Sequence, residues 1–152
     1  MIDRSGIICA GNWIVDLIHD LDRWPNESEL VRIGTQARGV GGGPANVITT
    51  LVKLETGLPL YPIGAIGEDE YGAFILKECR LLGLPTSGLI SKTDVATAHT
   101  HVMSVAGQSR TFFYQGGAND TLNIDDFPEG IFKDTSALIF YLGYLTLLRD
   151  LD

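Results

Sequence analysis

The sequence has few cysteines, few basic residues and no long apolar run. Two cysteines among 152 residues, Cys9 and Cys79, do not make the disulfide framework of a small secreted domain. Eleven Lys and Arg against nineteen Asp and Glu give a net charge of −8, the wrong sign for binding nucleic acid or anionic lipid. The longest apolar run, residues 137–148, is too short to cross a bilayer, and residues 1–10 lack the apolar core of a signal peptide. We therefore expect a cytoplasmic protein with no nucleic-acid or membrane partner.

Strand and helix patterns alternate along most of the chain. Short apolar runs over residues 6–10, 60–66 and 137–142 are typical of buried strands. Between them, apolar residues at helical spacing over 44–54 and 69–82 predict two helices. This order is typical of an α/β fold in which helices cover a parallel sheet, although three core strands are fewer than the roughly five to six of an average sheet.

A second sheet is predicted from four β-favouring segments, at residues 13–18, 30–35, 97–105 and 110–115. Gly107 and Gln108 lie between the last two segments and suit the central positions of a two-residue type II′ hairpin turn. Because these segments are more polar than the predicted core strands, we expect an antiparallel addition outside the parallel core.

Four of the five residues from 39 to 43 are glycine, and Pro44 follows them. The segment fails the dinucleotide pattern G-x-G-x-x-G because Pro44 occupies the third glycine position, and it lacks the lysine of a Walker A loop. Two interpretations remain. Either a ligand approaches the backbone closely and meets Asn46 in the first helical turn, or the segment is a tight strand-to-helix turn without a ligand.

Four segments are informative when their order and spacing along the chain are taken together. They are residues 11–16 (GNWIVD), 41–46 (GGGPAN), 64–72 (GAIGEDEYG) and 116–119 (GGAN). In this combination the chain resembles the ribokinase-like, or PfkB, family of carbohydrate kinases over essentially its whole length. Two departures, Ile48 in place of a small residue and Glu55 in place of a glycine, lie in the helix after the glycine string. We expect that helix to continue as far as Gly57.

The resemblance implies a ribokinase-like α/β fold, a parallel-sheet sandwich with helices and a small antiparallel β lid. Residues 1–152 would form the N-terminal part of one carbohydrate kinase domain, with lid strands at about 13–38 and 86–115. The C-terminal nucleotide-binding part would be absent. In this family the lid closes over the sugar and often supplies dimer contacts, so the resemblance also points to a homodimer through the lid sheet.

By the same resemblance, Asp16 would hold the hydroxyls of a sugar or sugar derivative. A carboxylate suits this role because it accepts several hydrogen bonds and its charge strengthens them. Asn12, Gly42, Gly43 and Asn46 would line the same pocket. The alternatives are a solvated loop aspartate for Asp16 and a helix cap for Asn46.

Strand alternation on the expected lid places Arg110, Phe112 and Tyr114 on one face, next to the turn that contains Asn119. Arg110, Tyr114 and Asn119 are therefore further candidates for substrate binding. A guanidinium that faces the substrate suits an acidic or phosphorylated sugar, because it binds carboxylate or phosphate in a two-point fork. The alternative for Arg110 is a solvated charge on an edge strand.

Other titratable residues carry weaker signals. His99 and His101 share one face of a strand, but no third ligand supports a metal pair, and lid surface or a substrate contact is the favoured interpretation. The sequence predicts no role for the isolated His19. Asp125 and Asp126 point in different directions, which favours a turn or a helix start over a carboxylate dyad.

Phosphoryl transfer also needs a base near the sugar hydroxyl and a nucleotide site with Mg²⁺. In this family both lie in the C-terminal part, at a D-T-x-G-A-G-D string that the sequence lacks. The pair Asp134-Thr135 instead continues into a predicted strand. We therefore expect an ATP-dependent carbohydrate kinase whose ATP, Mg²⁺ and catalytic base belong outside this chain, so that the chain alone is inactive. The alternatives are a nucleoside kinase of the same fold and a non-catalytic sugar- or nucleoside-binding module.

Overall fold

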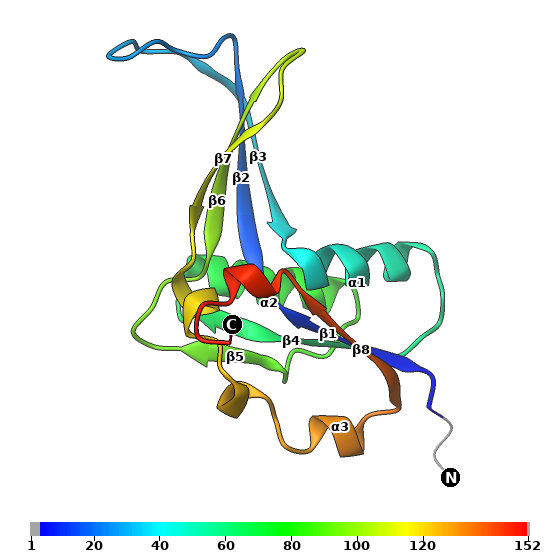
Figure 1. The fold of residues 1–152 in the computed structure, drawn as a ribbon. Helices are drawn as coiled ribbons and strands as arrows, with labels where there is room; N and C mark the ends of the chain where they lie inside the picture. Colours follow the sequence, from blue (N-terminus) through cyan, green and yellow to red (C-terminus); the bar gives the residue numbers. More distant parts are fainter. Residues whose placement is uncertain (1–3, 152) are drawn as a thin grey trace.

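Two four-stranded sheets organise the computed structural model, which describes residues 4–151. The core sheet has the order β5-β4-β1-β8, and all its neighbouring strands are parallel (Figure 1). Its members are β1 (Gly6–Gly11), β4 (Leu60–Gly67), β5 (Leu89–Lys92) and β8 (Ala137–Gly143). The prediction of three core strands was wrong because it omitted β5, whose four residues are too few to show a periodicity.

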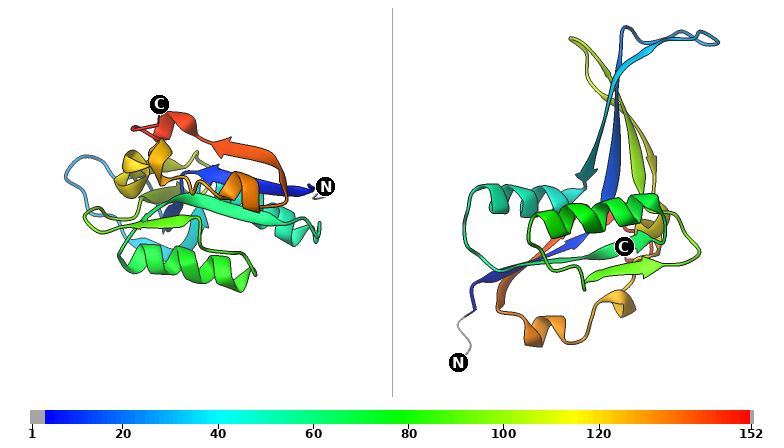
Figure 2. Two further views of the ribbon diagram at one scale, coloured as in Figure 1. Left: turned by 90° about the horizontal axis from the view of Figure 1, so that it is seen from below. Right: turned by 180° about the vertical axis from the view of Figure 1, so that it is seen from behind.

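Helices cover one face of the core sheet and short helical turns cover the other (Figure 2). The helices are α1 (Gly43–Lys53) and α2 (Glu70–Leu81). The short turns are η1 (Gly117–Thr121), η2 (Ile124–Asp126) and α3 (Ile131–Asp134). Alternate residues of β1 serve the two layers: Cys9 packs with the side chains of α1 and α2, whereas Ile8 and Ala10 pack on the opposite side.

Helix α1 ends earlier than predicted. It stops at Lys53 instead of continuing to Gly57, because Glu55 takes a left-handed backbone with φ 50°. Among the helices of residues 4–151, none is both long and apolar enough to cross a membrane.

The second sheet stands away from the core as a long arm (Figure 1). Its order is β3-β2-β6-β7, with β2 (Ile14–Leu21), β3 (Ile33–Gly41), β6 (His99–Val105) and β7 (Thr111–Gln115). Because β2 pairs antiparallel with β3 but parallel with β6, the sheet is mixed where a purely antiparallel one was expected. The expected lid segment 86–115 also began too early, since β5 pairs with β4 of the core.

Two connections in the second sheet differ from the sequence prediction. Strand β3 continues through Gly41, so Gly39 and Gly41 belong to a strand. On the neighbouring strand β2, Asp16 pairs with Gly39 and Ile14 pairs with Gly41. In the hairpin between β6 and β7, the N–H of Gln108 donates to the carbonyl of Val105 at 3.0 Å. The central residues of that turn are therefore Ala106 and Gly107, one position earlier than predicted.

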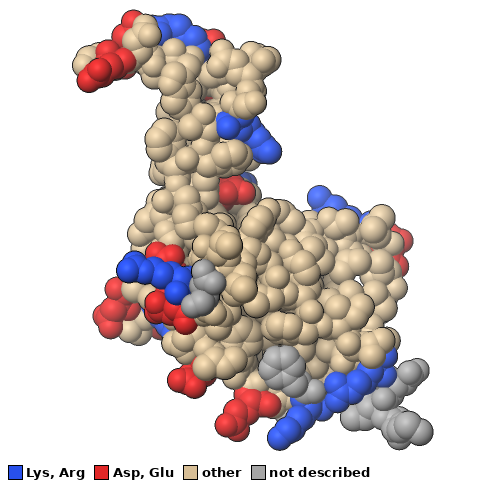
Figure 3. Space-filling view, viewed as in Figure 1, with Lys and Arg blue, Asp and Glu red and all other residues tan. Residues whose placement is uncertain are grey.

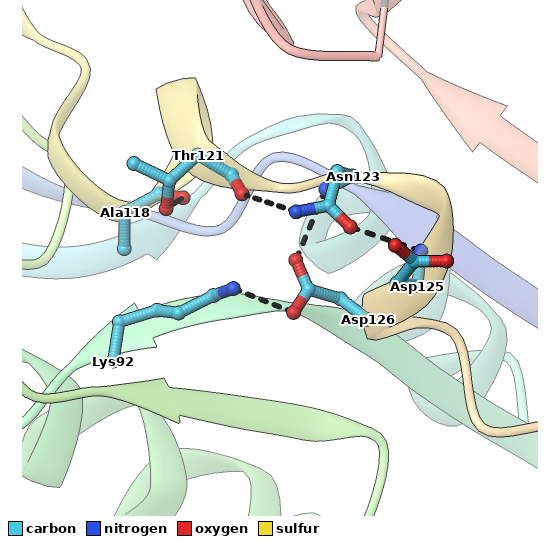
Figure 4. Close-up of polar contacts among 6 residues, drawn as sticks. All are labelled: Lys92, Ala118, Thr121, Asn123, Asp125 and Asp126. Carbon is cyan, nitrogen blue, oxygen red and sulfur yellow. Dashed lines mark hydrogen bonds and ion pairs between the residues drawn. The ribbon is translucent and has the colours of Figure 1, made fainter.

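Polar contacts fix the chain after η1 to the end of β5 (Figure 4). Asn123 and Asp126 form a capping box at η2, in which the N–H of Asn123 donates to the Asp126 carboxylate at 3.0 Å. The other oxygen of Asp126 pairs with the ammonium of Lys92 in a largely buried position. The prediction that Asp125 and Asp126 mark a helix start is confirmed.

The carboxylate of Asp69 caps α2 and joins it to the root of the second sheet. It accepts hydrogen bonds from the N–H of Gly72 at 2.8 Å and from the N–H and hydroxyl of Thr97 at 2.7 and 2.6 Å. Burial opposes the charged form, but these hydrogen bonds outweigh it and hold the pKa of Asp69 below its usual value. Through Asp69, the 64–72 segment thus helps to connect the two sheets where they meet.

Three histidines lie on the face of the second sheet that points away from Asp16. Nε2 of His19 and Nδ1 of His101 are 3.1 Å apart, and the Gln36 amide nitrogen lies 3.0 Å from Nδ1 of His19. Because that nitrogen only donates, His19 accepts at Nδ1 and donates from Nε2 to His101. His99 packs against His101 and against Tyr71 of α2. Burial, reinforced by the charges of His19 and His99, lowers the pKa of His101.

We expect the free energy of unfolding to fall as the pH decreases through the ordinary histidine value of 6.5. The unfolded chain takes up a proton at His101 first, because folding lowers its pKa, whereas well above that pH both states are neutral there. Denaturant unfolding of the wild type and His101→Gln between roughly pH 5 and pH 8 measures the effect. The variant should lose part of the pH dependence, and identical profiles would contradict the lowered pKa of His101.

Candidate functional site

A cavity of about 480 Å³ opens where the second sheet joins the core. Its walls come from the second sheet, from the connection between β1 and β2, from the start of α1 and from the segment after β8. The lining residues are Asn12, Ile14, Asp16, Gly42, Asn46, Thr100, Arg110, Phe112, Tyr114, Tyr144 and Leu147. Six of the eight predicted substrate residues are among them. A smaller hollow of about 230 Å³ between α1 and α2 contains none of the eight.

The glycines beside the cavity allow other parts of the chain to pack closely against them. A Cβ on Gly41 would overlap the carboxylate of Asp16, and a Cβ on Gly42 would overlap the carbonyl oxygen of Asn12. Gly42 also has φ 94° and ψ 158°, a backbone region essentially restricted to glycine. These glycines therefore bring β3 and the start of α1 against the connection between β1 and β2, which forms the floor of the cavity.

Asp16 lies half-buried on β2 without a hydrogen-bond partner among residues 4–151. Burial raises the pKa of its carboxyl, and the positive charge of Arg110 offsets part of that rise. Its oxygens are therefore available to accept hydrogen bonds from a bound molecule, and hydroxyl groups are suitable donors.

Asn12 offers a buried donor to the same space. Its Oδ1 accepts a hydrogen bond from the N–H of Gly43 at 3.2 Å, whereas its Nδ2 has no partner. A buried polar group without a partner costs roughly 1–3 kcal/mol. Because Asn12 lines the cavity, a ligand oxygen there would complete its hydrogen bonding.

Arg110 and Tyr114 line the cavity together with Phe112, as strand alternation predicts. The guanidinium of Arg110 lies over the Phe112 ring, 5.4 Å from its centroid. Asn46 lines the cavity from α1, and the cap residue of that helix is Gly42, so Asn46 is not its cap. The cavity thus combines one carboxylate, one guanidinium and two side-chain amides.

The structure places Gly43 and Asn119 outside the lining. A Cβ on Gly43 would lie 3.0 Å from the hydroxyl of Tyr141 and 3.1 Å from Gly143, so this glycine lets α1 pack closely on β8. Asn119 is fully buried and uses its amide for hydrogen bonds within the protein. Spacing alone could not separate these two residues from their neighbours that reach the cavity.

Sequence reasoning missed Thr100, Tyr144 and Leu147. Thr100 lies opposite Asp16 in the parallel pairing of β6 with β2, a register between segments far apart in the sequence. Tyr144 follows β8 with a left-handed backbone, φ 52°, and Leu147 lies in η3 (Leu145–Leu147). No sequence motif after β8 indicated that this segment of the chain folds back to line the cavity.

Among the described residues, Asp16 is the only carboxylate that lines the cavity. In residues 4–151 no three His, Cys, Asp or Glu side chains are grouped so that they could hold a metal ion. His99 and His101, considered from the sequence as a metal pair, instead contact each other and His19.

The pfkB family carbohydrate kinase model matches residues 4–143. The chain belongs to the pfkB family of carbohydrate kinases. It is 32% identical over 139 residues to 5-dehydro-2-deoxygluconokinase from Listeria innocua, a match that covers 90% of this chain and 41% of that protein. The chain therefore spans about two fifths of the length of the curated relatives it matches.

Solved structures agree with this family and with a ribokinase-like fold. Ribokinase from Giardia lamblia superposes with a TM-score of 0.81 at 21% identity, over 91% of this chain and 44% of that one. Ribokinase from Arabidopsis thaliana, complexed with ribose and ATP, gives 0.71 at 25% identity, over 91% and 45%. The family and the fold class expected from the four sequence segments are confirmed.

We expect Gly42→Ala to destabilise the chain far more than Gly57→Ala. Both glycines have positive φ, but nothing lies within 4 Å of a Cβ on Gly57, whose substitution should cost about 1–2 kcal/mol. Overlap with the Asn12 carbonyl adds to the backbone strain at Gly42, so its cost should exceed about 3 kcal/mol. Urea unfolding of both variants measures the difference, and equal costs would contradict the close approach of α1 to Asn12.

Proposed function

We propose that this chain supplies the sugar-binding site and the lid of an ATP-dependent carbohydrate kinase, which transfers the γ-phosphate of ATP to a sugar hydroxyl. The observation that carries the proposal is the convergence of Asn12, Asp16, Gly42 and Asn46 on one cavity. An unpaired amide donor and a free carboxylate suit a polyhydroxylated ligand, because each sugar hydroxyl both donates and accepts hydrogen bonds.

The substrate class that fits the cavity is an acidic sugar derivative. Arg110 brings a guanidinium to the wall, where it can bind a carboxylate in a two-point fork, while Asp16 accepts hydroxyl hydrogen bonds. The named activity of the Listeria innocua relative, a 5-dehydro-2-deoxygluconokinase, supports a sugar acid. Burial raises the pKa of Asp16 and the positive charge of Arg110 lowers it, so the two charged groups are close enough to influence each other.

The second sheet would act as a lid over this ligand. Arg110, Phe112 and Tyr114 would contact the sugar from the arm, while Asn12 and Asn46 would hold it from the core. Closing such a lid excludes water from the transferred phosphate, which limits hydrolysis of the donor.

The catalytic base, ATP and Mg²⁺ would be held by a further part of the complete enzyme. Strand β8 forms one edge of the core sheet and exposes Leu138 (68%) and Ile139 (52%). The side of the molecule on which β8 lies has few charged groups over the core, as Figure 3 shows. Additional parallel strands of the complete enzyme would cover this edge. Because the sequence lacks the D-T-x-G-A-G-D string that carries the base in this family, the chain alone is not expected to turn over ATP.

The arm also offers a surface for a second copy of the chain. Trp24 stacks on Phe113 at 6.5 Å, and both rings are about half exposed beside Ile33 on the face turned away from Asp16. An exposed apolar patch on an otherwise charged arm favours self-association. The molar mass in solution tests this homodimer: Trp24→Ser with Phe113→Ser should give a monomer, and an unchanged mass would contradict it.

We expect Arg110→Met in the complete enzyme to weaken use of a sugar acid selectively. Loss of a charged hydrogen-bonding partner should raise KM for 5-dehydro-2-deoxygluconate by about tenfold or more and leave KM for an uncharged sugar within about twofold. Arg32→Met is a matched control, because Arg32 is exposed on the same arm and does not line the cavity. Unchanged KM for every accepted substrate would remove Arg110 from the binding site.

A further inference from the structure

Asn119 connects three parts of the molecule that surround the cavity. Its Oδ1 accepts a hydrogen bond from the N–H of Trp13 at 3.2 Å, and its Nδ2 donates to the carbonyl of Trp13 at 3.2 Å. The same Nδ2 also donates to the hydroxyl of Tyr114 at 3.4 Å. One buried amide therefore links η1 to the β1–β2 connection and to strand β7 of the arm.

The partners of Asn119 on the core side are firmly held. The indole nitrogen of Trp13 donates to the carbonyl of Ile63 at 2.9 Å, and the whole side chain is buried. On η1, the N–H of Ala118 donates to the carbonyl of Ala96 at 2.8 Å. The Trp13 peptide and η1 thus form a fixed base from which Asn119 reaches the arm.

Tyr114 is the partner on the arm side, and it lines the cavity. Trp13 directly follows Asn12, whose unpaired Nδ2 belongs to the same cavity. The two hydrogens of the Asn119 amide nitrogen serve the carbonyl of Trp13 and the hydroxyl of Tyr114, so the amide bonds to both. The bond to Tyr114, whose ring lines the cavity, joins the floor of the site to strand β7 of the arm.

We propose that Asn119 is a positioning residue that couples strand β7 to the floor of the cavity, so that Tyr114 and Asn12 meet a bound sugar in a fixed relative geometry. This inference rests on the proposed sugar-binding function. Asn119 itself touches no ligand, because it is fully buried and outside the lining.

The first test needs no ligand. Burial raises the pKa of the Tyr114 phenol, and the hydrogen bond from Asn119 lowers it. Ultraviolet titration of the wild-type chain, with Tyr114→Phe to identify its signal, should show a higher Tyr114 pKa in Asn119→Leu. Asn119→Asp keeps the size of the side chain but loses the donor, so it should raise the same pKa and guards against misfolding of the leucine variant. An unchanged Tyr114 pKa in the folded variants would overturn the proposal.

The second test measures coupling in the binding of 5-dehydro-2-deoxygluconate by the complete enzyme. Tyr114→Phe and Asn119→Asp should each weaken binding by about tenfold in calorimetry, and the double variant should be little weaker than either one. Additive losses would mean that Tyr114 acts without Asn119, which overturns the proposal. If the wild type bound no sugar acid and no ribose, the proposed function would fail, and the tyrosine titration alone would decide the role of Asn119.

Discussion

The close approach of Gly42 to the carbonyl of Asn12 is the contact on which the rest of the site depends. It requires a backbone that glycine adopts readily, and it is reinforced by the hydrogen bond from the Gly43 N–H to the side chain of Asn12. Together these contacts bring the end of β1, the root of β2 and the start of α1 to one point. Asp16 and Asn46 face a common cavity because the elements that carry them meet there.

The chemistry of the cavity follows from how this junction distributes polar groups. The core side presents the amides of Asn12 and Asn46, which suit hydroxyl groups, and the second sheet presents the carboxylate of Asp16 together with Arg110, which suits an acid. Polar recognition is therefore divided between a fixed floor and an arm that projects from the core (Figure 1). Asn119 lies where the two halves join, and the histidines occupy the opposite face of the arm. The cavity and the histidine cluster thus lie on different faces of one sheet.

Sequence reasoning predicted the elements with strong periodicity and the family, since four ordered motifs are specific and α1, α2, β1, β4 and β8 carry clear patterns. It missed β5 because a four-residue strand shows no period. It also assigned Gly39 and Gly41 to a loop, because pairing of β3 with β2 is a tertiary effect that no local preference encodes. At the site, motif positions predicted four of the lining residues, and strand alternation predicted two more, Arg110 and Tyr114. The burial of Asn119, the packing of Gly43 and the return of Tyr144 to the cavity depend on long-range contacts and could not be read from spacing.

The most direct test of the proposed sugar site is a titration of the isotopically labelled chain with 5-dehydro-2-deoxygluconate, in which backbone amide resonances are followed by NMR. Weak binding suffices, because NMR detects complexes with Kd on the order of millimolar. A sugar bound in the cavity should shift the amide resonances of Gly42, Asn46, Arg110 and Tyr114, which surround it. Uncharged ribose should produce smaller shifts at Arg110 than the sugar acid does. Absence of shifts at these amides, or shifts confined to the hollow between α1 and α2, would contradict the proposed sugar site.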